Sequence, residues 1–240
     1  MSPKGLAAYY VVLSAIGATF LGVVAWRSPA SSPIPSADRV LVASAFVAVC
    51  VLGLASAVRP NRIRRLTSGW SHGLRGGPAP ASRPYRGHHP DCEHFAAHVI
   101  RMGARTLCAG CTGLGIGAFV AAILMAVYAW LLGGLPVNPP AAVLVFGVGL
   151  VTLNYVEVAI RRGHAMVHTA ANVLLVLGFL FLTVGTVEAT GKAAYGLLAV
   201  VVSLLMVDTR IRLSSWRHVD LRRRCGEACD AVGGPATSGG

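Results

Sequence analysis

Residues 112–132 read TGLGIGAFVAAILMAVYAWLL, a run of 21 residues without a charged side chain. A helix of about 20 mainly apolar residues spans the hydrocarbon core of a bilayer, which is roughly 30 Å thick. Five more runs have the same character: Leu6–Trp26, Val40–Val58, Ala141–Ile160, Met166–Val187 and Ala193–Val207. The sequence therefore predicts an all-α fold, an integral membrane bundle of about six transmembrane helices.

The composition of the whole chain agrees with a membrane protein. Hydrophobic residues make up 55% of its 240 residues and charged residues only 12%, with a mean hydropathy of +0.64. Soluble globular chains carry about 25% charged residues. The shortage of charge therefore reflects long segments that face lipid instead of water.

The basic residues predict the orientation of the spans, because cytoplasmic connections are enriched in lysine and arginine. With the N-terminus inside, the inner segments hold 18 of the 21 lysine and arginine residues. The outer connections hold only Arg27, Arg39 and Lys192. We therefore expect a multi-pass protein of the inner, or cytoplasmic, cell membrane with both termini in the cytoplasm.

This topology divides the chain into four segments. They are a transmembrane hairpin at 1–58, a basic cytoplasmic loop with a Cys/His motif at 59–107, a four-helix transmembrane region at 108–207 and a basic cytoplasmic tail at 208–240. Apolar residues between Ile211 and Leu221 favour a further amphipathic helix in the tail. The net charge of +12 indicates contact with anionic membrane lipids, and no nucleic-acid partner is expected.

Residues 88–113, HHPDCEHFAAHVIRMGARTLCAGCTG, concentrate cysteine and histidine at the start of the third span. Two of these residues form a C-x-x-C, a spacing that lets two sulfurs bind one ion or each other. A helical pattern from Asp91 to Met102 places two of the histidines on one face. Three thiolates and one histidine make a closed zinc site. The candidate metal ligands are Cys92, His94, His98, Cys108 and Cys111, with His89 beside them.

Other chemistry fits the same residues. Covalent haem attachment needs a histidine after the second cysteine, and Thr112 stands there instead. A thiol–disulfide pair at a helix start is a second interpretation, although the cytoplasmic side expected for it is reducing. An iron or iron–sulfur centre also accepts three cysteines and a histidine. Zinc is the cofactor that the sequence favours, and cysteines without a ligand role stay an alternative.

Polar and ionisable residues lie at the fourth and fifth spans, where burial in lipid is costly and marks candidate functional positions. Glu157 precedes an arginine by four residues, so a simple ion pair is one explanation for it. His164, His168 and Asn172 follow at four-residue intervals and should form a polar stripe on the fifth helix. Together with Asn154, these residues are candidates for orienting the metal ligands, completing the site or lining a pathway.

Three further features concern helix packing and the remaining cysteines. Gly113 and Gly117 make a small-residue face that would let another helix approach the cysteines closely. Cys50 lies in the second span, where cysteine behaves as a small hydrophobe, and no function is assigned to it. Cys225 and Cys229 form a C-x3-C in the tail, either to pass a metal or a reducing equivalent to the main site or as exposed thiols.

The chain resembles a family of small polytopic membrane proteins classed as domain of unknown function 2085. Members of that family have a cysteine and a histidine ahead of a Cys-x-x-Cys-Thr-Gly that opens a transmembrane helix. The matching residues are Cys92, His94, Phe95, Cys108, Cys111, Thr112 and Gly113. Typical members have histidine directly after the first cysteine and arginine inside the C-x-x-C, where this chain has Glu93 and Ala109-Gly110. The resemblance covers residues 88–117, supports a site at these cysteines and implies no particular activity.

Three functions follow as hypotheses. No P-loop, H-E-x-x-H or nucleophile elbow is present, so no catalytic residue is assigned and an enzyme is not favoured. The leading hypothesis is a binding or scaffold protein stapled by zinc, with membrane lipids and another membrane subunit or a second copy of the chain as partners. The alternatives are a transporter or metal-handling protein that uses Glu157 and His168, and a membrane thiol oxidoreductase that uses Cys108 and Cys111.

Overall fold

The computed structural model describes residues 2–28, 30, 34–58, 99–102, 105–132, 140–160 and 164–233, and for 58, 101–102, 105–106 and 218–233 it describes the course of the backbone only. The helices are α1 (Pro3–Arg27), α2 (Ser36–Val58), α4 (Ala109–Val127), α5 (Pro140–Ala159), α6 (Ala165–Thr190) and α7 (Ala193–Gly233). A π-helical turn, η2 (Tyr128–Leu132), continues α4.

Six helices in the described part of the chain are long and apolar enough to cross a membrane. The segments that could cross a membrane are Pro3–Arg27, Ser36–Ala57, Ala109–Leu132, Pro140–Ala159, Ala165–Thr190 and Ala193–Arg217. Helices suit lipid because each pairs its own backbone N–H and C=O groups, and hydrocarbon offers these groups no hydrogen-bond partner. The predicted all-α fold and the predicted number of spans are therefore confirmed.

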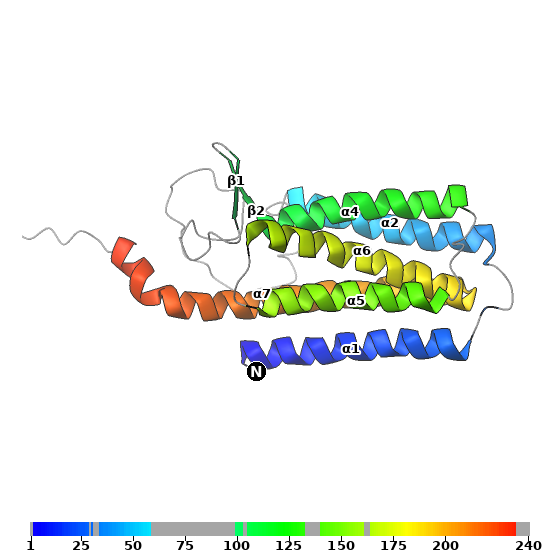
Figure 1. Cartoon of the computed structure of the whole chain (residues 1–240), viewed down its shortest axis with the longest axis horizontal. Coiled ribbons are helices and arrows are strands. Elements are labelled where there is room, and N and C mark those ends of the chain that lie inside the picture. The colour runs from blue at the N-terminus through cyan, green and yellow to red at the C-terminus, as the bar shows by residue number, and fades with distance from the viewer. Residues whose placement is uncertain are drawn as a thin grey trace, which may run out of the picture.

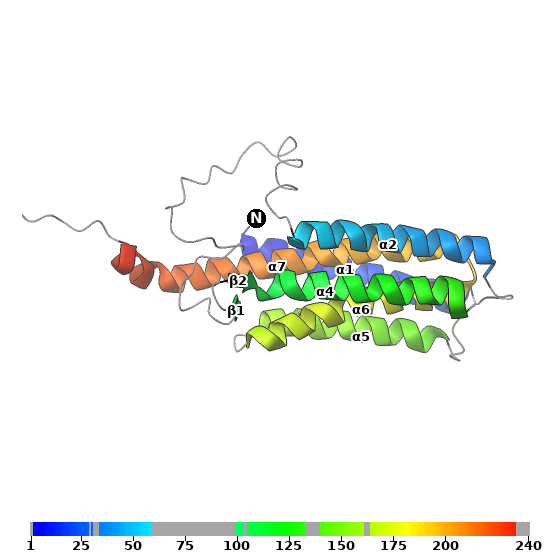
Figure 2. The ribbon, with the colours of Figure 1, turned by 90° about the horizontal axis from the view of Figure 1, so that it is seen from above.

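The six helices lie along the long axis of the molecule, and consecutive helices run in opposite directions (Figure 1). As a result the N-terminus, the start of α4 and the exit of α7 share one end of the bundle, as the perpendicular view also shows (Figure 2). We call this the thiol end, because α4 begins there directly after Cys108. At this end α7 continues beyond the other helices.

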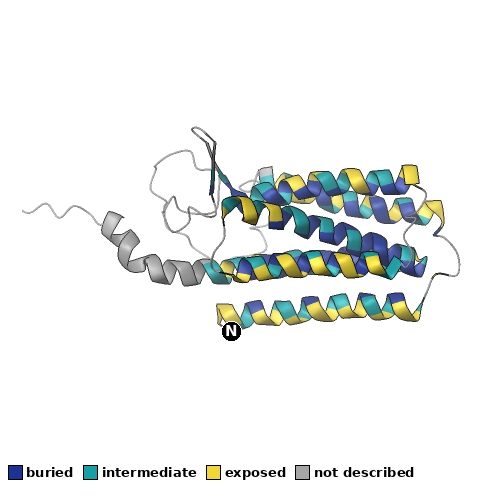
Figure 3. Ribbon diagram, viewed as in Figure 1, coloured by how far each residue is buried: buried dark blue, intermediate teal, exposed yellow. Residues whose placement is uncertain are grey.

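α6 is the central helix of the bundle. It packs against α4, α5 and α7. In its most apolar 18-residue window, 72% of the residues are buried, whereas the figure for α1 is 22%. Figure 3 shows the buried residues of α6 as a dark blue band. α1 packs mainly on α7 and α2 mainly on α4, so these two consecutive helices have different main partners. Polar groups on α6 are consequently those best placed to meet groups from other helices.

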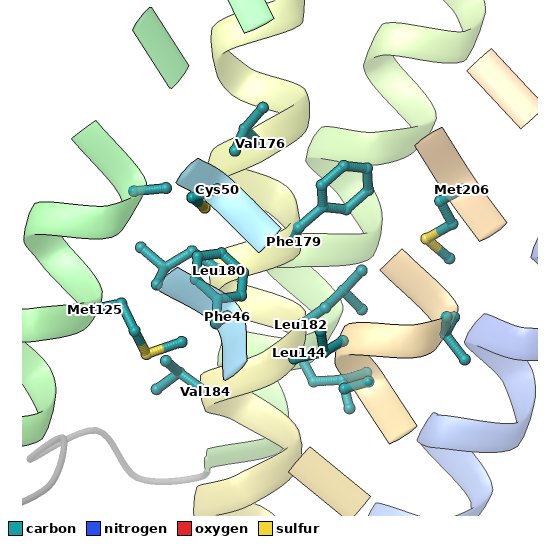
Figure 4. Packing of buried hydrophobic residues seen from close by; sticks show 14 of the residues in the cluster. Phe46, Cys50, Met125, Leu144, Val176, Phe179, Leu180, Leu182, Val184 and Met206 are labelled. Atoms are coloured by element: carbon teal, nitrogen blue, oxygen red, sulfur yellow. The ribbon is translucent and has the colours of Figure 1, made fainter. Parts of the chain in front are cut away.

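Leucine, valine, phenylalanine and methionine side chains fill the space between the helices (Figure 4). Met125, Leu175 and Leu182 are fully buried. Large apolar side chains also cover the outward faces, where Leu52 is 66% and Phe119 58% exposed. A helix that is apolar on its inner and outer faces is typical of a membrane span, because lipid replaces water on the outside.

Two local expectations are wrong. Val99–Met102, the end of the segment expected to be helical, is strand β1, and it pairs antiparallel with β2 (Arg105–Cys108). Val99 is β-branched and pairs with Cys108, so ladder hydrogen bonds replace the helical ones. The second correction concerns the tail, because α7 runs without a break from Ala193 to Gly233 where a short span and a separate amphipathic helix were expected.

Candidate functional site

The C-x-x-C lies where β2 ends and α4 begins. Cys108 is the N-cap of α4 and Cys111 lies in its first turn. Cys108 is buried and Cys111 is half-buried, and their side chains are hydrogen-bonded to each other. Both are present as thiols. The first turn of a helix directs backbone N–H groups and the positive end of the helix dipole at such side chains, which stabilises a sulfur anion when one forms.

Glycines on α4 allow α6 to approach this turn. A Cβ on Gly113 would lie 2.8 Å from the Cβ of Asn172 and still closer to the carbonyl oxygen of Thr169. A Cβ on Gly117 would lie 3.0 Å from the Cα of Val173. The expected small-residue face is therefore confirmed, because α6 lies against these two glycines more closely than any larger residue would permit.

The close approach brings polar groups of α6 to the start of α4. The Thr169 hydroxyl donates a bifurcated hydrogen bond, to the carbonyl oxygen of Ala165 on its own helix at 2.9 Å and to that of Ala109 on α4 at 3.3 Å. A Cβ on Gly110 would lie 3.3 Å from Nε2 of His168. The imidazole of His168 is thus held beside the C-x-x-C turn, as the sequence suggested for the fifth span.

His168 connects charged groups from two other helices. Its Nδ1 lies 3.0 and 3.1 Å from the two carboxylate oxygens of Glu157 on α5. Its Nε2 lies 3.3 Å from Nη2 of Arg210 on α7. A guanidinium only donates hydrogen bonds, so Nε2 accepts and Nδ1 carries the proton that is donated to Glu157. A neutral imidazole therefore bridges one cation and one anion. Arg161, the possible ion-pair partner of Glu157 four residues on, lies outside the described residues.

Arg210 completes the site and was missed in the sequence. It belongs to the segment expected to be a basic tail, but its side chain is only 7% exposed. Its guanidinium interacts electrostatically with Cys108, Cys111 and Glu157. The neighbouring Thr209 bonds to Ser14 of α1, and the next residue on a helix lies about 100° further round. That rotation turns Arg210 from α1 toward α4 and α6. An arginine within one turn of an apolar run was the available signal.

The other polar residues of the fourth and fifth spans have different environments. His164 is exposed at the N-cap of α6, so the stripe does not face one site along its whole length. Asn172 is fully buried and donates a side-chain hydrogen bond to the carbonyl oxygen of His168. Asn154 is also fully buried, and neither its side-chain nitrogen nor its oxygen has a hydrogen-bond partner among the described residues.

The remaining candidate ligands lie outside the described residues. These are His89, Cys92, His94 and His98. Within the described ranges no group of three or more His, Cys, Asp or Glu side chains is arranged to hold a metal ion. Cys225 and Cys229 belong to α7, of which only the backbone is described at those positions. The two ligands of the predicted zinc site that are described, Cys108 and Cys111, do lie together.

Comparison with known proteins finds no matching family model, no similar curated protein and no similar solved structure. The resemblance at residues 88–117 stays a prediction. The site is accordingly defined by its own contacts: two adjacent thiols at the start of α4, a neutral histidine from α6 and a buried arginine from α7.

Proposed function

We propose that this chain is a multi-pass membrane thiol–disulfide oxidoreductase whose redox pair is Cys108 and Cys111. The observation that carries the proposal is the contact between the two thiols in the first turn of α4, with the guanidinium of Arg210 beside them. Attack by a thiolate on a disulfide is the chemical step of such enzymes, and a helix N-terminus and a cation both stabilise that thiolate.

The surroundings of the pair also support exchange chemistry over a purely structural role. A structural cysteine pair in a core needs only apolar packing. Here the described neighbours include a buried cation and a hydrogen-bonded histidine. Holding these groups in an apolar bundle costs stability, which a function that uses them explains.

The test is the redox titration of the full-length protein in detergent, poised in glutathione buffers. Remaining thiols are alkylated and each cysteine is assigned by peptide mass spectrometry. We expect Cys108 and Cys111 to oxidise together with one midpoint. Cys50, buried in the core, is the internal control and should stay a thiol. If Cys108 and Cys111 stay thiols under every buffer that oxidises exposed cysteines, the proposal is wrong.

A second candidate function, the metal-stapled binding or scaffold protein, is favoured by the register of the hairpin. Val99 follows His98 directly in the sequence and pairs with Cys108. Two of the proposed ligands, Cys108 and Cys111, lie together at the start of α4. Cys92 and His94 belong to the connection that precedes it in the sequence. Three cysteines and one histidine suit zinc or iron.

Metal analysis by plasma mass spectrometry separates the two candidates. Near-stoichiometric zinc or iron in the wild-type protein, lost in the variant with Cys108→Ser and Cys111→Ser, supports the metal site. Thiols that resist alkylation until a chelator is added would agree with it. Reactive thiols without metal support the redox pair. The transport hypothesis for Glu157 and His168 stays a prediction.

A further inference from the structure

A large cavity adjoins the thiol pair. Its volume is about 690 Å³, and it lies among α2, α4, α6 and α7. This volume is within the range of about 300–1,000 Å³ that is usual for small-molecule sites. Four of the residues that line it are the polar groups already described: Cys108, Cys111, His168 and Arg210. The rest of the lining is mainly apolar and includes Phe46, Val49, Val176, Phe179 and Val200.

The apolar part of the cavity reaches the outer surface between α2 and α7. Leu52 on α2 and Leu204 on α7 both line it, and they are 66% and 46% exposed. Both positions lie in helices long enough to cross the membrane, so this opening faces lipid. Three of the lining residues, Cys50 on α2 and Val176 and Phe179 on α6, lie near one another in Figure 4. A ligand therefore enters from the bilayer and has an apolar body.

The charges at the polar end of the cavity favour a ligand with an uncharged headgroup. Arg210 contributes one positive charge, Glu157 one negative charge, and His168 between them is neutral. The nearest further charges on α7, Asp208 and Arg212, form an ion pair of their own at 3.4 Å. Among these described side chains the charges therefore balance, and none of their positive charge is left over for a phosphate or carboxylate head. A neutral head that accepts hydrogen bonds fits better.

One hydrogen-bond donor at the polar end of the cavity has no acceptor among the described residues. The Nε atom of Arg210 is buried and has no hydrogen-bond partner among the described residues. Leaving a buried donor unsatisfied costs about 1–3 kcal/mol. A carbonyl oxygen of a ligand in the cavity would satisfy it, because Arg210 lines that cavity.

We infer that the cavity binds a membrane quinone, whose head lies beside Arg210, Cys108 and Cys111 and whose apolar tail extends between α2 and α7. This inference rests on the proposed thiol chemistry. A quinone combines a neutral ring, carbonyl oxygens that accept hydrogen bonds, and a tail soluble in lipid. The reaction is balanced: the two thiols form one disulfide and release two electrons and two protons, and the quinone takes up both to become the quinol.

The experiment uses the full-length protein in detergent, pre-reduced and freed of reductant, with a decyl-tailed benzoquinone as the probe. Quinone reduction is followed by absorbance under anaerobic conditions, and disulfide formation by alkylation. Oxidised glutathione serves as a soluble oxidant for comparison. We expect the wild-type protein to reduce one quinone per thiol pair, and the variant with Cys108→Ser and Cys111→Ser to bind the quinone without reducing it.

A matched pair of variants on α2 tests the place of binding. Val49→Phe puts a ring into the cavity, whereas Val51→Phe adds the same ring at a position that is 57% exposed on the lipid side and does not line it. Val49→Phe should slow oxidation by the quinone about tenfold or more, because filled space excludes the ligand, and should leave oxidation by glutathione unchanged. Val51→Phe should resemble the wild type in both reactions.

The outcomes separate the quinone inference from the redox proposal. Oxidation by glutathione without any oxidation by the quinone overturns the inference and leaves the redox pair standing. Equal rates for Val49→Phe and Val51→Phe overturn it as well, since the quinone then reacts elsewhere. Failure of both oxidants to form the Cys108–Cys111 disulfide rejects the proposed function itself. Displacement of a co-purified phospholipid by the quinone, without turnover, would identify the cavity as a lipid site and also contradict the inference.

Discussion

Replacing Gly113 with alanine should separate α4 from α6 and destabilise the bundle. The new Cβ would lie 2.8 Å from the Cβ of Asn172, where ordinary contacts begin near 3.4 Å, and closer still to the backbone oxygen of Thr169. Because that oxygen is backbone, α6 must move away by at least about half an ångström. Overpacking of this kind costs about 1–3 kcal/mol, and better helix propensity returns about 0.5–1 kcal/mol. We expect a net loss of about 1–2 kcal/mol.

Gly115→Ala is the matched control on the same helix. A Cβ there would meet the Cβ of Ala57 at 3.5 Å, an ordinary contact. Without a clash, the gain in helix propensity should leave the variant unchanged or more stable by up to about 1 kcal/mol. The assay is reversible unfolding of each purified variant in mixed detergent micelles, followed by circular dichroism and titrated with sodium dodecyl sulfate.

The site provides a second readout for Gly113→Ala. Movement of α6 should also lengthen the hydrogen bond from Thr169 to Ala109, now 3.3 Å, and draw His168 away from the thiols. We therefore expect the midpoint of Cys108 and Cys111 oxidation to shift in Gly113→Ala and not in Gly115→Ala. Equal stability of the two variants would refute the argument that glycine permits this helix approach.

Two other predictions concern helix packing and the contacts that join Glu157, His168 and Arg210. Gly147→Ala should destabilise by about 1–2 kcal/mol, because its Cβ would lie 2.7 Å from the backbone nitrogen of Leu182, whereas Gly149→Ala, with open space around it, should not; the same unfolding assay compares them. Glu157→Gln and Arg210→Met should each destabilise by about 3 kcal/mol, since each leaves a buried charge uncompensated. The double variant should recover most of that loss, and additive losses in a double-mutant cycle would contradict the coupling through histidine.

The six spans were predictable because lipid makes local sequence decisive. A run such as 112–132, without charge, has one stable conformation in hydrocarbon whatever its neighbours are. The four-residue spacing of His168 and Asn172 and the glycines at 113 and 117 were equally visible, because helical periodicity alone puts such residues on one face. The structure confirms that His168, Asn172 and both glycines face the packed interior at the thiol end.

Local pattern failed where two conformations compete. Val99–Met102 has apolar residues at a spacing that fits a helix, yet it forms β1 by pairing with β2. A strand is stabilised by a partner that lies elsewhere in the chain, so its own spacing does not reveal it. The continuity of α7 was missed for a similar reason, since a charge at 208 marks the end of an apolar run without ending a helix.

The sequence by itself determined the all-α membrane architecture, the C-x-x-C at the start of a span and the small-residue face beside it. Only the tertiary structure decided that Arg210 on α7 turns inward to His168 on α6, which in turn contacts Glu157 on α5. It also decided that α2 and α7 leave a cavity next to the thiols. The physical reason is that periodicity fixes the face of a residue on its own helix, whereas the neighbour of that face depends on how six helices pack together.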